Sequence, residues 1–109
     1  MINREKIMEM IGCDSDFVNQ LLEQFVIECT DSVKKINEAY ANNDWQIIRG
    51  VSHKMLSSSR ILTLDNLTTL LKEIETLAEN RTNLEKMPSL LEKLNTEIKL
   101  IFSELKDIK

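Results

Sequence analysis

The stretch that decides the fold, residues 47–62, reads IIRGVSHKMLSSSRIL. At about 100° per residue its apolar side chains fall on one side of a helix, and that side should face a core. The residues of this arc are Ile47, Ile48, Val51, Met55, Ser58 and Leu62. His53, the only histidine of the chain, lies nearly opposite the middle of the arc. The pattern therefore predicts an amphipathic helix that presents its one histidine outward.

Further amphipathic helices are predicted on both sides, separated by short polar turns. Gly12 is typical of a helix end, and Asp44 and Asp65 are typical helix caps. Before the last helix, Thr82 and Glu85 match a capping box, whereas Pro88 favours a start near Met87 instead. The predicted helices cover residues 4–11, 16–41, 45–62, 65–80 and a last segment that ends near 107. The apolar stripe of the longest helix consists of Phe17, Leu21, Leu22, Phe25, Val26, Cys29, Val33, Ile36 and Tyr40.

Four long helices joined by short turns predict an all-α protein, an antiparallel up-and-down four-helix bundle with a short extra N-terminal helix over one end. The chain has 109 residues, with only two glycines and one proline, so we expect one domain over residues 1–109. A long coiled coil is the weaker alternative, because interruptions at Asn42, Thr63 and Arg81 are regularly placed.

Composition excludes several classes of protein. The net charge of −4 argues against a nucleic-acid binder, which needs clustered basic residues. No stretch approaches the roughly 18 apolar residues of a membrane span, and the N-terminus lacks the apolar core of a signal peptide. We therefore expect a cytoplasmic domain without membrane contact. Cys13, placed in a loop, and Cys29, placed in the core, are too few and too far apart for a zinc site.

The surroundings of His53 leave room for a partner. Gly50 and Ser57 are its lateral neighbours on the helix, and both are small. A mid-helix glycine costs about 1 kcal/mol relative to alanine, so Gly50 serves either access or close packing against another helix. Leu56 is also placed on the outer face.

Three basic residues accompany the histidine on this helix. Arg49 and Arg60 share its outer face, and Lys54 lies toward one side. In a chain of net charge −4 they create a local positive field, which suits a phosphoryl group or an acidic partner. For Lys54 alone, an ordinary solvated position is the simpler interpretation.

The run HKMLSSS at residues 53–59 resembles the core of histidine-containing phosphotransfer (HPt) domains of two-component phosphorelays. Their motif reads roughly His-x-Leu-Lys-Gly-Ser-Ser, on the second helix of a four-helix bundle. The resemblance extends over nearly the whole chain. Residues that follow at the spacing of the family are Leu62, Leu67, Leu70, Leu71, Ile74 and Glu75.

This resemblance implies that His53 accepts a phosphoryl group through Nε2 from a receiver-domain aspartate and passes it to a second receiver. Glu75 occupies the family position that can hydrogen-bond the other ring nitrogen, although it could also be an ordinary exposed glutamate. The implied partners are response-regulator receiver domains and a hybrid histidine kinase. The domain is expected to be a monomer without a cofactor, with Mg²⁺ on the receiver only, and not an autonomous kinase, because no ATP-binding domain is present.

Two positions depart from the family motif. Leu56 stands where the family has lysine or arginine, and Ser57 stands where it has glycine. Either Arg49, Lys54 or Arg60 supplies the missing charge, or transfer is slower, or the domain binds receivers without transferring phosphate.

We expect Leu56 to join Gly50 and Ser57 in a partner-docking surface, and Leu56 is also the residue that favours a module that binds without transferring phosphate. A structural bundle that dimerises through an exposed apolar strip is the remaining alternative. Leu56 is the one residue that clearly favours it.

Overall fold

The structure is a computed structural model that describes residues 4–12 and 15–108, and all regular structure within these ranges is helical. The all-α prediction is confirmed, and each predicted helix agrees with the structure to within one residue at either end. Cys13, predicted in a loop, lies outside the described residues. The elements are α1 (Arg4–Ile11), α2 (Ser15–Ala41), α3 (Trp45–Ile61), α4 (Asp65–Asn80), the 3₁₀ turn η1 (Leu84–Lys86) and α5 (Met87–Ile108).

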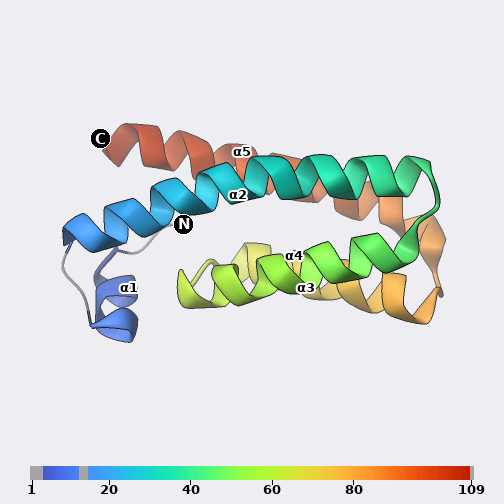
Figure 1. Ribbon diagram of the computed structural model, residues 1–109, viewed down its shortest axis with the longest axis horizontal. Helices are drawn as coiled ribbons and strands as arrows, with labels where there is room; N and C mark the ends of the chain where they lie inside the picture. Colours follow the sequence, from blue (N-terminus) through green and yellow to red (C-terminus); the bar gives the residue numbers. More distant parts are fainter. Residues whose placement is uncertain (1–3, 13–14, 109) are drawn as a thin grey trace.

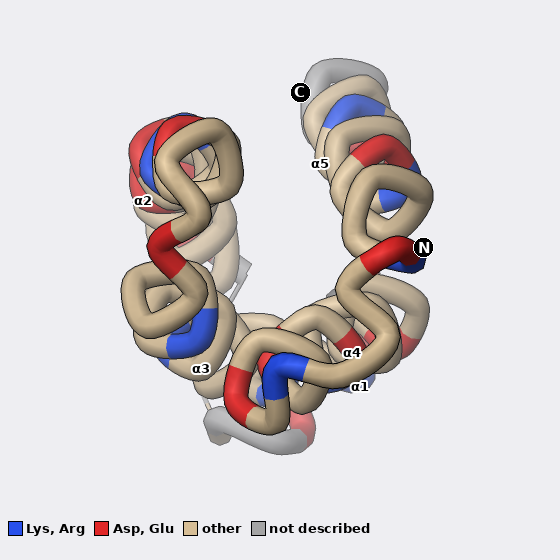
Figure 2. The backbone as a smooth tube through the Cα atoms, turned by 90° about the vertical axis from the view of Figure 1, so that its right-hand side faces the viewer, with Lys and Arg blue, Asp and Glu red and all other residues tan. Residues whose placement is uncertain are grey.

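The four long helices α2 to α5 form the predicted antiparallel up-and-down bundle (Figure 1). Viewed along the bundle, α2 and α5 occupy two corners, with α3 and α4 below them (Figure 2). Helix α3 packs most extensively against α4 and then against α2, whereas α2 and α5 contact each other much less. Helix α1 contacts α2 and α3 and so covers one end of the bundle, as predicted. In the described part of the chain, no helix is both long and apolar enough to span a membrane.

Most of the predicted apolar positions are buried, but α3 is rotated relative to the prediction. Ile48, Met55 and Leu62 lie in the core as expected. Ile47 does not, because its side chain is 46% exposed. The core face contains residues that the pattern had not placed there, Ser52, Leu56 and Ser59. At about 100° per residue, the buried face is turned by roughly 60° toward α4.

The reason for this rotation is that α3 packs closely against α4. Small serine side chains at a helix contact allow the two backbones to approach, whereas the apolar pattern alone assigns serine to the surface. A smaller error of the same kind occurs on α2, where Val18 is buried and Phe17, predicted in the core, is exposed.

The helix ends follow local chemistry in most places. Asp44 caps α3 as predicted, because its Oδ1 accepts a hydrogen bond from the backbone N–H of Ile47 at 3.2 Å. The prediction that Asp65 caps α4 is wrong: Asp65 is the first residue of the helix, and Leu64 occupies the cap position without a side-chain bond. The carboxylate of Asp65 still lies at the positive end of the dipole of α4.

Helix α5 begins at Met87, with Pro88 in its first turn, which confirms the prediction based on the proline. The alternative start at a capping box of Thr82 and Glu85 is wrong, because Asn83, in left-handed conformation, precedes η1 there.

The turn between α3 and α4 stores strain at Thr63. Two backbone hydrogen bonds close the turn, from Thr63 N to Arg60 O at 3.1 Å and from Leu64 N to Ser59 O at 2.9 Å. This geometry requires a left-handed residue, and Thr63 has φ 55°. A β-branched side chain is poorly suited to that conformation, and the buried Thr63 hydroxyl has no hydrogen-bond partner among the described residues.

We predict that Thr63→Gly stabilises the domain by about 1 kcal/mol, since glycine adopts this conformation without a Cβ clash. Urea unfolding monitored by circular dichroism measures the change. Asn43→Gly, at the equivalent left-handed position with φ 55° between α2 and α3, should gain less because asparagine tolerates this region. A Thr63→Gly variant no more stable than the wild type would show that the turn is not strained.

Candidate functional site

His53 lies in the middle of α3 with its side chain 66% exposed. The prediction that this histidine faces solvent from a rigid element is confirmed. A helix on which both neighbouring turns pack into the core holds the backbone under the ring in place. The imidazole is therefore reachable by another protein without local unfolding.

Glu75 on α4 orients the imidazole ring. Its Oε1 lies 3.1 Å from Nδ1 of His53, and its side chain is only 18% exposed. The alternative that Glu75 is an ordinary exposed glutamate is therefore wrong. A carboxylate only accepts hydrogen bonds, so Nδ1 carries the proton in this contact. In the neutral ring, Nε2 then keeps its lone pair and is free to act as a nucleophile.

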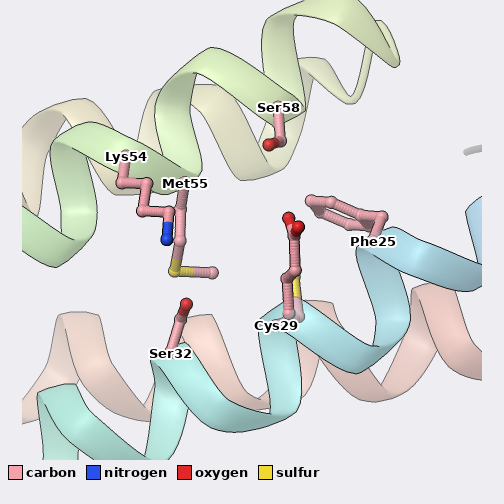
Figure 3. A pocket seen from close by; sticks show the side chains of 7 residues that line it. Phe25, Cys29, Ser32, Lys54, Met55 and Ser58 are labelled. Carbon is pink, nitrogen blue, oxygen red and sulfur yellow. The ribbon is translucent and has the colours of Figure 1, made fainter. Parts of the chain in front are cut away.

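The three predicted cations do not all lie on the same side of α3. Arg49, half-buried, lies one turn before His53 on the side that faces α4, and it forms no ion pair with any residue that the structure describes. Arg60 is exposed on the same side, two turns beyond His53. Lys54 instead extends toward α2 (Figure 3). The structure thus brings two arginines, and not Lys54, to the side of the ring.

Gly50 and Ser57 are both exposed on the outer surface of α3. A Cβ added at Gly50 would meet no atom within 4 Å. Close packing against another helix of this chain therefore does not explain the glycine. The two small residues leave an open surface beside His53, as the access interpretation predicts.

The prediction that Leu56 belongs to the outer, partner-docking face is wrong. Its side chain is only 3% exposed and is part of the core. The rotation of α3 toward α4 turns this position inward. Two apolar residues that the sequence pattern did not assign to the surface, Ile47 and Ile61, are exposed instead, and Ile61 lies beside α2. The sequence did contain a signal for the face of α3 that is buried. The spacing alternates between four and three residues along Ile48, Ser52, Met55, Ser59 and Leu62.

A small pocket lies between α2 and α3 (Figure 3), whereas Glu75 contacts His53 from α4. Phe25, Cys29, Lys54 and Ser58 are among the residues that line it. Burial, and then the charge of Glu28, raise the pKa of the Cys29 thiol to about 12. Cys29 is therefore protonated at neutral pH and unreactive, in agreement with its predicted place in the core.

Comparison with known proteins identifies the family of this chain. The family model of the Hpt domain matches residues 20–107, which is most of the chain, and the chain therefore belongs to the Hpt domain family. The comparison with curated proteins found no match. Histidine phosphotransfer in a phosphorelay is thus the function of the chain, and receiver domains are its partners.

Two solved structures share the fold. One is histidine-containing phosphotransfer protein B (HptB) from Pseudomonas aeruginosa PAO1, with a TM-score of 0.86 and 22% identity over 97% of this chain and 91% of that one. The other is the HPT domain of the Hpt sensor hybrid histidine kinase from Shewanella, with a TM-score of 0.84 and 20% identity over 98% of this chain and 92% of that one. Both confirm the four-helix bundle.

Proposed function

We propose that His53 is the phospho-accepting residue, which takes a phosphoryl group from one receiver aspartate and gives it to another. The observation that carries this proposal is the contact between Nδ1 of His53 and Glu75 at 3.1 Å, on a histidine that is otherwise exposed. This contact leaves Nε2 unprotonated and directed at solvent, which is the state required of a nitrogen nucleophile.

The transfer is a displacement at phosphorus. Nε2 attacks the aspartyl phosphate of the receiver in line, the P–N bond forms, and the P–O bond to the aspartate breaks, which leaves a free carboxylate. The ring becomes positively charged as the bond forms, and the carboxylate of Glu75 stabilises that charge through the proton on Nδ1. The same steps in reverse pass the group to a second receiver. Magnesium remains with the receiver in this scheme.

Arg49 supplies the charge that the family places three residues after the histidine. Leu56 stands there and is buried, so that position offers no cation to the phosphoryl group. Arg49 is one turn from His53, on the same side of α3, and has no competing ion pair among the described residues. Arg60 is two turns away and acts more weakly, and Lys54 is directed toward α2. A guanidinium is always charged and can bind phosphoryl oxygens with two parallel bonds.

The receiver docks over the small residues Gly50 and Ser57, which form the open surface beside His53. The donor receiver belongs to a hybrid histidine kinase in the cytoplasm. This agrees with the likeness to an HPT domain that is itself part of such a kinase. The domain works as a monomer, because His53, Glu75 and Arg49 all come from one chain. Leu56, the residue that favoured a dimerising module, is buried and so offers no exposed apolar strip.

Replacing His53 with glutamine should abolish phosphoryl uptake and leave the fold unchanged, because the side chain is exposed and glutamine is compatible with a helix. The experiment incubates the domain with a phosphorylated receiver and measures acid-labile phosphate on it. Circular dichroism provides the control for folding. Acid-labile phosphate on His53→Gln would assign the chemistry to another residue. A wild type that binds the receiver but takes up no phosphate would favour the non-transferring module.

Arg49→Ala should slow transfer about tenfold, the equivalent of about 1.4 kcal/mol of lost charge-assisted bonding in the transition state. Rapid-quench measurement of single-turnover uptake gives the rate. Arg60→Ala is the matched control, since it removes the same charge from the same side of α3 at twice the distance along the helix, and its effect should be smaller. If Arg49→Ala transfers at the wild-type rate, Arg49 does not compensate for Leu56.

Ser57→Arg should weaken receiver binding by tenfold or more, because a long charged side chain would occupy the surface over which the receiver approaches. Calorimetric titration with the receiver measures the affinity. Thr96→Arg on α5 adds the same charge at an exposed position of a helix that does not pack on α3, and it should bind normally. Equal affinities of the two variants would place the docking surface elsewhere.

A further inference from the structure

Two hydroxyl groups join α3 to α4 near the turn between them. The Oγ of Ser59, which is fully buried, lies 2.9 Å from Oγ1 of Thr68. Each hydroxyl also lies within bonding distance of a carbonyl on its own side of the turn, Ser59 Oγ at 3.0 Å from Leu56 O and Thr68 Oγ1 at 2.9 Å from Leu64 O. These contacts form a short network, buried at Ser59 and partly buried at Thr68, across the contact surface between α3 and α4, here called the seam.

The 2.9 Å distance between the two hydroxyl oxygens favours a proton between them, which either residue can supply. If Ser59 donates to Thr68, then Thr68 donates to the carbonyl of Leu64. If Thr68 donates to Ser59, then Ser59 donates to the carbonyl of Leu56. Each hydroxyl has one proton, and both of these arrangements place one proton between the helices. If both hydroxyls donated to their own carbonyls, their lone pairs would face each other at 2.9 Å, which is repulsive and disfavours that arrangement. The geometry therefore favours a hydrogen bond between Ser59 and Thr68, with either residue as the donor.

This bond and the contact of His53 with Glu75 are the two side-chain hydrogen bonds that join α3 and α4 in the described part of the chain. They fit one register of the antiparallel pair. His53 lies six residues before Ser59 on α3, and Glu75 lies seven residues after Thr68 on α4. A slip of one residue moves a helix by about 1.5 Å, which is enough to break a hydrogen bond.

The other buried contacts of this seam are less directional. Leu56 contributes apolar packing, and the buried hydroxyl of Ser52 has no partner among the described residues. Apolar contacts resist separation of the helices but favour no single pair of atoms. The hydroxyl pair is thus the contact best able to prevent α3 from sliding along α4 and so to set the register of the two helices.

We propose that Ser59 and Thr68 are positioning residues, which hold the register in which Glu75 orients the ring of His53. The inference rests on the proposed role of His53 for its effect on transfer, although its structural part is independent of that role. The hydroxyl pair touches neither the ring nor the incoming phosphoryl group. It acts on the site only through the placement of α4.

Three variants on α4 test the proposal. Thr68→Val keeps the shape of the side chain but removes the hydroxyl, and Ser59 can still donate to Leu56 O, so no buried donor is left unpaired. Thr68→Ser retains the hydroxyl. Thr69→Val is the matched control: Thr69 also donates to the carbonyl four residues before it, Asp65 O, but its side chain is exposed and has no bond to α3.

The first readout is the tautomer of His53 in the unphosphorylated domain, from nitrogen-15 NMR. The assignment is unambiguous because the chain has one histidine. Thr68→Val should lower the fraction with the proton on Nδ1 toward that of Glu75→Ala, a reference without the carboxylate. The second readout, phosphoryl uptake from a receiver, should fall roughly three- to tenfold. Thr68→Ser and Thr69→Val should match the wild type in both.

The proposal is overturned if Thr68→Val and Thr69→Val show the same tautomer fractions, or if Thr68→Ser is as impaired as Thr68→Val. The tautomer measurement needs no phosphate. A wild type that takes up no phosphate would therefore overturn the proposed function of His53, while the positioning role is still decided by NMR.

Discussion

The close contact of α3 with α4 is the constraint on which the rest of the site depends. Helix α3 carries the histidine, and its rotation about its own axis decides which side chains meet the core and which meet a partner. Ser52, Leu56 and Ser59 turn toward the core on this side. With this face fixed, His53 stands at the edge of the seam, where it is exposed to solvent but still within reach of Glu75. A rotation in either direction would bury the ring or separate it from the carboxylate.

The helices themselves could be predicted from the sequence because local chemistry determines them. Gly12, Asn43 and Asp44 mark ends that the structure confirms, and the scarcity of glycine and proline accounts for the helix lengths. The rotation of α3 could not be predicted from apolar periodicity, since two of its core positions are serines. Ile47 and Leu56 were each assigned to the wrong side for this reason. Packing against a particular neighbour, and not the hydrophobicity of the residue, decided both positions.

The histidine and its carboxylate partner could be predicted, and the charges around them could be ordered by their spacing along the helix. His53 is unique in the chain, and Glu75 followed from the resemblance to the family. The sequence placed Arg49 and Arg60 on the outer face with the histidine, Arg49 being nearer to it, and Lys54 toward one side. The structure shows in addition that Lys54 extends toward α2 (Figure 3). By helix geometry, the two arginines lie on the side of α3 that carries the ring. Long flexible side chains of this kind have many rotamers, and their direction is set by the neighbouring helix.

Leu56 stands where the family has a basic residue, and the cation beside the histidine matters for a domain that must both accept and release a phosphoryl group. A cation beside the phosphohistidine stabilises the loaded state as well as the transition state. Each 1.4 kcal/mol of stabilisation that is confined to the loaded state shifts the equilibrium tenfold toward retention and slows the onward step. On the proposed role of Arg49, this charge comes from one turn before His53 instead of one turn after it. The share of its stabilisation that falls on the loaded state then sets how readily the phosphoryl group passes to the second receiver.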